Sequence, residues 1–260
     1  MGTQIFLRKP PQYVIDWIES HSQPAVHEET WYKYAGDTEW HTVMLSGTIA
    51  LVDKMGSPTG QIDNPANIVA ISIGTGTQAN PVTSIRDYAF LDCNGLTSVT
   101  IPNSIAGIGN YAFQGCYGLT SVTIPNGVTN IGNYAFRGSG LMNVTIPDNV
   151  MSIGDGAFEN CVRLTSATIG NGVTRIEDNA FASCCLMSVT IGHGVTSIGR
   201  YAFCNCDSLT SVEFEGNAPT VGTNAFADVA SGCKAIITST VTGFPEAGET
   251  WNGLIVEVKS

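Results

Sequence analysis

The stretch YAFQGCYGLTSVTIP, from Tyr111 to Pro125, decides the fold because close variants of it recur along the chain. In each variant an Ala-Phe pair is followed by a cysteine, then a leucine, then a short Val-x-Ile run. Successive copies of the phenylalanine are separated by 23, 23, 22, 23, 22 and 23 residues: Phe90, Phe113, Phe136, Phe158, Phe181, Phe203 and Phe226. A fixed period of this length is the signature of a solenoid, in which each repeat forms one structural turn.

Further columns of residues keep the same phase as the phenylalanine. Alanine precedes each phenylalanine, and isoleucine or valine stands five residues before it. A leucine column follows at Leu96, Leu119, Leu141, Leu164, Leu186 and Leu209. One turn cannot bury its own apolar side chains, so the turns must stack into a continuous core.

Each repeat is predicted to contain one short strand and one short helical turn. Val99 and Ile101 share a strand face because side chains alternate along a strand, and the proline that follows lacks the N–H needed to continue it. The next segment contains Asn and Gly, which suit a turn. Ala112 and Phe113 then stand four and five residues after Ile108, a spacing that favours a helical turn packed inward.

Repeats of the form V-T-x-I-G-x-x-A-F-x-x-C-x-x-L-T-S-V-T-I-P resemble the BspA-type leucine-rich repeats of bacterial surface proteins, from Val82 to Phe226. The segment ETWNGLIVEV (249–258) is similar to the closing segment of such arrays. The resemblance implies an α/β solenoid, namely a right-handed leucine-rich-repeat superhelix with repeats of 22–23 residues. It also implies a role in adhesion and in binding host or matrix molecules. No set of catalytic residues comes with this repeat.

Residues 67–260 are predicted to form the solenoid. The segment NIVAISI (67–73) is predicted to be the first rung. A C-terminal cap is predicted from about residue 227 to residue 260. Within it KAIITS is expected to form the last strand, and Trp251 is expected to cover the exposed end of the core.

Residues 1–66 are predicted to form a small, mainly β N-terminal domain outside the repeats. A short helix is expected in PQYVIDWIESHS and a hairpin in TWYKYAGDTEWHTVML. The domain carries Trp17, Trp31 and Trp40, and so small a segment has limited volume in which to bury them. We therefore predict that it is the attachment end, through which copies associate into a homo-oligomer or a larger assembly. The alternative is a self-contained cap that buries every ring.

The overall charge argues against a nucleic-acid partner. The formal net charge is −11 and only 13% of the residues are charged, and an acidic chain without a basic stripe repels phosphate backbones. No apolar stretch approaches the roughly 18 residues of a membrane helix, so no membrane insertion is expected. The N-terminus lacks the apolar segment of a secretory signal, which leaves a cell-surface or extracellular location, implied by the resemblance, beside that of a virion component.

The cysteines are predicted to be structural. Five of the eight occupy one repeat position, and serine replaces them once: Cys93, Cys116, Ser139, Cys161, Cys184 and Cys206. Small buried thiols that serine can replace fit this pattern. Disulfides between rungs are not expected because stacked side chains point in parallel, and the spacings do not match a zinc site.

The chain offers no catalytic, cofactor-binding or metal-binding residues to name. ISIGTGTQA (71–79) imitates a dinucleotide-binding loop, but Asn80-Pro81 and a repeat turn follow it in place of a helix. The four histidines do not form a zinc motif. An enzyme is the weakest of the hypotheses.

Two surfaces remain as candidates for recognition. Outward strand positions are expected to be mainly Ser and Thr, an arrangement without the Trp, Tyr or Arg that dominate interfaces. Tyr88, Tyr111 and Tyr134 stand two residues before successive phenylalanines and are expected about 5 Å apart, from the strand spacing. As an aromatic ladder they are candidates for binding a partner, together with Trp31 and Trp40 of the N-terminal domain. The favoured interpretation of the tyrosines is partial packing with the hydroxyls in water.

We therefore expect a non-catalytic binding or adhesion module that recognises a protein or glycan partner and needs no cofactor. The alternative is a structural or receptor-binding component of a phage or virus particle. Both hypotheses depend on the long surface that stacked repeats expose. The assignment to adhesion comes from the family resemblance alone.

Overall fold

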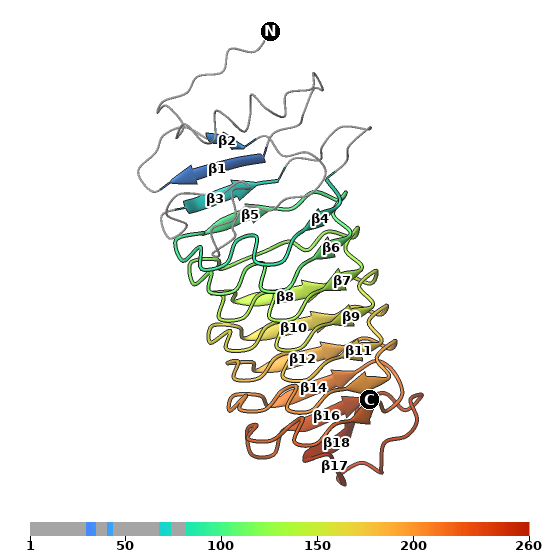
Figure 1. The fold of residues 1–260 in the computed structure, drawn as a ribbon. Helices are drawn as coiled ribbons and strands as arrows, with labels where there is room; N and C mark the ends of the chain where they lie inside the picture. The colour runs from blue at the N-terminus through green and yellow to red at the C-terminus, as the bar shows by residue number, and fades with distance from the viewer. Residues whose placement is uncertain (1–29, 35–40, 44–67, 74–81, 260) are drawn as a thin grey trace.

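The computed structural model describes residues 30–34, 41–43, 68–73 and 82–259. Their main feature is a β-solenoid of about 8 turns with repeats of about 23 residues. Figure 1 shows the rungs stacked one below the other, with two ladders of strands running side by side along the solenoid. The predicted solenoid is therefore confirmed.

The first ladder follows the predicted Val-x-Ile strands. Its parallel members are β8 (Asn143–Ile146), β10 (Ser166–Ile169), β12 (Ser188–Ile191), β14 (Ser211–Phe214), β16 (Lys234–Ile237) and β18 (Leu254–Val258). Equivalent residues of successive repeats pair directly, as Ser166 does with Asn143 and with Ser188. The second and fourth residues of β8, β10 and β12, which are Val or Ala and then Ile, are buried while the first and third are exposed or half-buried, which confirms the predicted alternation.

The second ladder was not expected from the sequence. It contains one two-residue strand from each rung, ending at the isoleucine or valine five residues before the phenylalanine. These strands are β4 (Ser84–Ile85), β6 (Gly107–Ile108), β7 (Asn130–Ile131), β9 (Ser152–Ile153), β11 (Arg175–Ile176), β13 (Ser197–Ile198) and β15 (Thr220–Val221). All of their pairings are parallel and in register.

The predicted helical turn is wrong. No helix occurs among the described residues, and the Ala-Phe corner is a turn. The residues two before and two after each phenylalanine have positive φ, between 55° and 72°, and include Tyr88, Tyr111 and Gly115. Left-handed residues on both sides of Ala-Phe interrupt a right-handed helix. The corner bonds to the next rung instead, as when the N–H of Phe113 donates to Ala135 O at 2.7 Å.

An N-terminal sheet joins the top of the solenoid. It has the order β2 (His41–Val43), β1 (Thr30–Tyr34), β3 (Ile68–Ser72) and β5 (Ser98–Thr100). The β1–β2 pairing is antiparallel and β3 pairs in parallel with β5, so the predicted hairpin and first rung are confirmed. The expected strand at Ser121–Ile124 is not formed, although its residues keep the alternating exposure. The predicted helix in residues 12–22 lies outside the described residues.

The core runs the length of the solenoid. Adjacent phenylalanine rings stack with centroids 4.9–5.4 Å apart, and six of the seven are fully buried. At the C-terminal end Trp251 packs against Phe214, Phe226 and Phe244, and β17 (Thr250–Trp251) pairs antiparallel with β18. The predicted capping role of Trp251 is confirmed, although the last parallel strand is β18 and not the KAIITS strand, β16.

Candidate binding surfaces

The outward residues at the Val-x-Ile positions of the successive repeats, here called the strand face, are mostly neutral and polar. Its residues are Ser98, Thr100, Ser121, Thr123, Asn143, Thr145, Ser166, Thr168, Ser188, Thr190, Ser211 and Glu213, all exposed or half-buried. Charged side chains enter only at the C-terminal end, where Glu213 pairs with Lys259 at 2.8 Å and Lys234 pairs with Glu257. The strand face is thus a long row of hydroxyl groups that ends in ion pairs.

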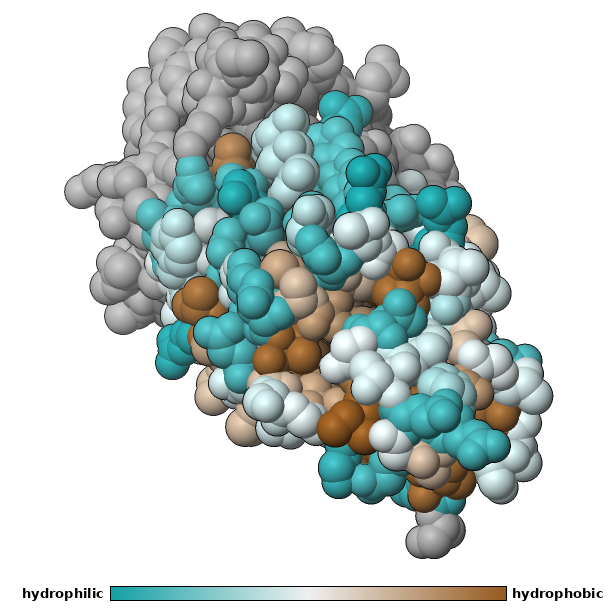
Figure 2. Space-filling model, turned by 90° about the horizontal axis from the view of Figure 1, so that it is seen from below, coloured by the Kyte–Doolittle hydropathy of each residue, from teal (hydrophilic) through white to brown (hydrophobic). Residues whose placement is uncertain are grey.

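Exposed apolar side chains are scattered over the surface. Tyr117, Met142, Met151, Val162 and Met187 are each about half exposed or more. On the face seen in Figure 2, hydrophobic residues form small patches separated by hydrophilic ones. Scattered apolar residues of this kind are ordinary for a folded protein, so they do not define a docking face.

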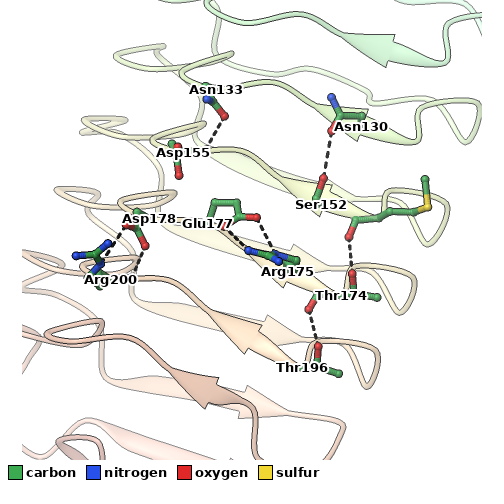
Figure 3. A network of polar contacts seen from close by, with 11 residues as sticks. Asn130, Asn133, Ser152, Asp155, Thr174, Arg175, Glu177, Asp178, Thr196 and Arg200 are labelled. Carbon is green, nitrogen blue, oxygen red and sulfur yellow. Dashed lines mark hydrogen bonds and ion pairs between the residues drawn. The ribbon is translucent and has the colours of Figure 1, made fainter.

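Polar side chains at the turns bond from one rung to the next. Asp87 Oδ1 accepts the N–H of Asn110, and Asn110 Oδ1 accepts the N–H of Asn133, both at 2.7 Å. Asn133 Oδ1 in turn accepts the N–H of Asp155 at 3.0 Å (Figure 3). Because buried or half-buried N–H groups need partners, these Asn and Asp side chains serve the fold.

Threonine hydroxyls beside the second ladder form a similar column. Thr174 donates to Met151 O, Thr196 to Thr174 O and Thr220 to Thr196 O, each at 3.1 Å, and Figure 3 shows two of these bonds. Ser152 Oγ donates to Asn130 Oδ1 on the same side. These polar groups are already partnered within the solenoid, which leaves less of this side free to bind a ligand.

The predicted aromatic ladder exists as a closed stack. The ring centroids of Tyr88 and Tyr111 are 4.9 Å apart with planes 6° from parallel, and those of Tyr111 and Tyr134 are 5.1 Å apart at 22°. The guanidinium of Arg137 lies 5.6 Å from the centroid of the Tyr134 ring and is paired with Glu159 at 2.8 Å. In this tyrosine stack the ring of Tyr111 is covered on both faces, whereas Tyr88 has one stacked partner and is 45% exposed.

The stack also explains how tyrosine is tolerated at these positions. Tyr88, Tyr111 and Tyr134 have φ of 62°, 57° and 55°, a left-handed conformation that costs an ordinary residue about 1–2 kcal/mol. A stacked aromatic pair contributes about 0.5–1.5 kcal/mol beyond burial. Stacking therefore offsets the backbone strain where tyrosines follow one another.

The same column holds one further tyrosine that sequence reasoning did not select. Tyr201 has φ of 57° and is 41% exposed, and its neighbours in the column are Asn179 and Asn224. No ring stacks on Tyr201 among residues 82–259. A pattern search for consecutive aromatic residues misses it because it stands alone.

The remaining predicted site residues lie in the N-terminal segment. Trp31 is in β1, paired with Thr42 of β2 and Ser72 of β3, and nothing is described of its side chain. Trp40 lies outside the described residues, as does the whole GTGTQA segment (74–79). The predicted roles of the two tryptophans stay predictions.

Five of the eight cysteines form a buried column of free thiols at one repeat position. All eight are free, and seven are buried. The Cys116, Cys161 and Cys184 thiols donate to the carbonyl oxygens of Phe90, Phe136 and Phe158 in the preceding rung, at 3.1–3.2 Å. Ser139 Oγ lies 3.3 Å from Cys161 Sγ, which shows how serine replaces a thiol here. The predicted structural role is confirmed.

Burial makes most of these thiols poor nucleophiles. It raises the pKa of Cys93 and of Cys206 to about 12, from an ordinary value of 9.0, and raises the pKa of Cys184. The thiolate is the reactive form, so these three thiols are inert near neutral pH. Cys161 differs, because although the side chain is fully buried, hydrogen bonds with Cys184 and Ser139 lower its pKa. No group of three or more His, Cys, Asp or Glu side chains in the part of the chain that the structure describes is arranged to hold a metal ion.

The repeat columns can now be compared with known proteins. The family model of the BspA type leucine-rich repeat region, in six copies, matches residues 70–187 and 174–247. The chain belongs to this family. The match covers the rungs that supply the phenylalanine, tyrosine and cysteine columns, so these columns are features of BspA-type repeats in this chain.

The chain is also similar to proteins whose structures have been solved, and the first of them supports the fold. The crystal structure of the T. pallidum leucine-rich repeat protein is 29% identical over 62% of this chain and 76% of its own, with a TM-score of 0.57. The pneumococcal vaccine antigen PcpA is 18% identical over 74% of this chain and 41% of its own, with a TM-score of 0.47. No curated protein sequence shows a significant match.

Proteins with BspA-type repeats are commonly associated with surfaces. Within the described residues, no helix is long and apolar enough to span a bilayer.

Proposed function

We propose that this BspA-type repeat protein is a non-catalytic binding and adhesion module that recognises a protein or glycan partner. The observation that carries the proposal is the strand face, which displays neutral polar side chains from Ser98 to Thr190, with equivalent residues paired in register from Asn143 to Thr190. Several polar groups at the turns have a partner in the next rung, whereas these outward side chains contribute little to the core. They are the part of the repeat that is free to serve recognition.

The chemistry of the strand face indicates the kind of contact. Hydroxyl and amide groups both donate and accept hydrogen bonds. The strand-face residues from Ser98 to Thr190 are uncharged, so this part of the face does not attract a charged polymer. The face therefore suits an extended, neutral, polar partner. Affinity on such a face comes from many weak contacts rather than from one hot spot.

Binding of the full chain to immobilised matrix proteins and to a glycan array tests the proposal. The change Thr145→Arg/Thr168→Arg places two long charged side chains in the middle of the strand face, and binding is expected to fall about tenfold or more. Ser239→Arg is the matched control, because Ser239 is exposed in a C-terminal turn away from this face. Unchanged binding by the double variant, or no binding by the wild-type chain, contradicts the proposal.

We further propose that residues 1–66 serve attachment or self-association. The support is the pairing of β1 with β3, which continues the solenoid's sheet into this segment. If the segment is an attachment end, the full chain is an oligomer in solution and deletion of residues 1–66 gives soluble monomers. A full chain that is already monomeric, with a truncated form that only aggregates, indicates a simple cap.

A further inference from the structure

We propose that Tyr201, with Asn179 and Asn224 on either side of it, forms a binding site for the ring of a neutral sugar. The inference rests on the proposed function and narrows its partner to a glycan. It places the aromatic contact on one isolated tyrosine and not on the tyrosine stack.

The three side chains come from successive rungs that are bonded to one another. The N–H of Asn179 donates to Arg200 O at 2.9 Å, and the N–H of Tyr201 donates to Thr223 O at 3.2 Å. All three residues have left-handed backbone with φ of 57–58°. They therefore occupy the same position of three consecutive turns, with the tyrosine in the middle.

Tyr201 differs from the tyrosine stack in what covers its ring. In the stack, Tyr111 has a ring on each side and Tyr134 has Tyr111 and the Arg137 guanidinium. Among residues 82–259, no ring or guanidinium lies over Tyr201, and the side chain is 41% exposed. The exposed fraction of Tyr201 is close to the 45% of Tyr88 at the end of the tyrosine stack, so what distinguishes Tyr201 is the lack of a stacked ring on either face.

The backbone gives no reason for a tyrosine at this position. A large residue with positive φ is an outlier, whereas Asn and Gly adopt this conformation readily. The column uses Gly at 156 and Asn at 179 and 224, and stacking compensates for tyrosine only in the first three rungs. A strained residue without structural compensation is a candidate for function.

The surrounding groups match the chemistry of a sugar. A pyranose has an apolar C–H face that packs on an aromatic ring, and a rim of hydroxyls that exchange hydrogen bonds with amides, which both donate and accept. The side-chain amides of Asn179 and Asn224 make no hydrogen bond to the described residues. The charged residues next to Asn179 and Tyr201 in the sequence, Asp178 and Arg200, are paired with each other at 3.3 Å (Figure 3). The site is therefore neutral, which favours an uncharged sugar.

The test is saturation-transfer NMR on the full chain with glucose, galactose, mannose and N-acetylglucosamine, each titrated at millimolar concentration. We expect at least one of them to bind and Tyr201→Asn to weaken that binding about tenfold or more, the effect of losing one aromatic contact. Tyr201→Phe keeps the ring and is expected to retain binding. Asn already occupies the neighbouring rungs, so Tyr201→Asn should fold and melt at or above the wild-type temperature.

Tyr111→Asn is the matched control, because it removes a ring of the tyrosine stack at the same backbone position. It should leave sugar binding unchanged. Binding that survives Tyr201→Asn, or that is lost equally with Tyr111→Asn, overturns the inference, as does the failure of all four sugars to bind. In those cases the proposed function stands if the wild-type chain still binds matrix proteins or the glycan array, and both fail if it binds nothing.

Discussion

Two columns only two residues apart in each repeat behave very differently. The phenylalanine column is the same in all seven turns, whereas the column two residues before it contains Tyr, Gly and Asn. The phenylalanines are buried and stacked along the axis, so each must fill the space its neighbours leave. The second column faces outward and shares only a positive φ.

The difference separates two kinds of sequence constraint. Burial fixes both the size and the shape of a side chain because interiors are close-packed. A left-handed backbone angle only favours Gly, Asn and Asp, so a tyrosine in such a column needs another reason. Stacking supplies that reason for Tyr88, Tyr111 and Tyr134, and ligand binding is our proposal for Tyr201.

Alkaline pH should affect the interior most strongly. Burial raises the pKa of Cys93 and Cys206 to about 12 and of Cys233 to about 11, against 9.0 for an ordinary thiol. Above pH 9 the unfolded chain loses these protons while the folded chain keeps them. The free energy of unfolding should therefore be unaffected by the thiols below pH 9 and fall as the pH rises toward 12.

Urea unfolding at a series of pH values measures this loss. The variant Cys93→Ser/Cys206→Ser is the control, because serine does not ionise in this range, and its stability should fall less steeply. Equal slopes for the two proteins would show that the thiols are not shielded by the fold.

Removing one ring from the phenylalanine column should be the most damaging single substitution. Phe158 is fully buried and stacks on Phe136 and Phe181 at 5.3 and 5.0 Å. Phe158→Ala is expected to lower the free energy of unfolding by about 3–5 kcal/mol, measured by urea denaturation. A loss near zero would mean that the column is not the core.

Substitutions in the cysteine column test whether the thiols stabilise the fold as hydrogen-bond donors or only as small apolar side chains. Cys161 donates to Phe136 O and contacts Ser139, so Cys161→Ser keeps a donor while Cys161→Ala removes both the donor and the sulfur. We expect Cys161→Ala to cost about 1–2 kcal/mol and Cys161→Ser to cost less. If serine proves worse than alanine, the column is selected for apolar volume alone.

Thiol titration gives a second view of the same column. In the native protein only Cys185 is exposed, so one thiol should react rapidly and seven should react only after unfolding. Several fast thiols in the native state, or no free thiol after unfolding, would contradict the buried, reduced column.

The sequence predicted the period, the inward strand residues and the cysteine column, because each is set by burial and repeats in every turn. It failed at the corner. The spacing of Ile108, Ala112 and Phe113 fits a helix, but Tyr111 and Gly115 are left-handed. Gly156, Asn179 and Asn224 in the same column as Tyr111 indicate a left-handed conformation, because Gly and Asn adopt it readily. The four tyrosines in the column made this pattern hard to recognise.

The candidate site was only partly predictable for a related reason. Consecutive tyrosines are easy to recognise, yet their closeness is what closes their faces. Tyr201 is distinguished by the absence of an aromatic residue at the same position in the two adjacent rungs. This absence is recognised only when the rungs are aligned with one another. The second ladder was missed because two-residue strands carry too little alternation to recognise.

The most direct test of this account is the difference in unfolding free energy between Tyr111→Asn and Tyr201→Asn, measured by urea denaturation. Both changes relieve a left-handed tyrosine, but only the first breaks two stacked contacts, each worth about 0.5–1.5 kcal/mol. We predict that Tyr201→Asn is as stable as the wild-type chain or more stable, and that Tyr111→Asn is about 1–2 kcal/mol less stable than Tyr201→Asn. Equal stabilities, or a larger loss for Tyr201→Asn, would contradict the claim that stacking holds one set of tyrosines and leaves the other free for a ligand.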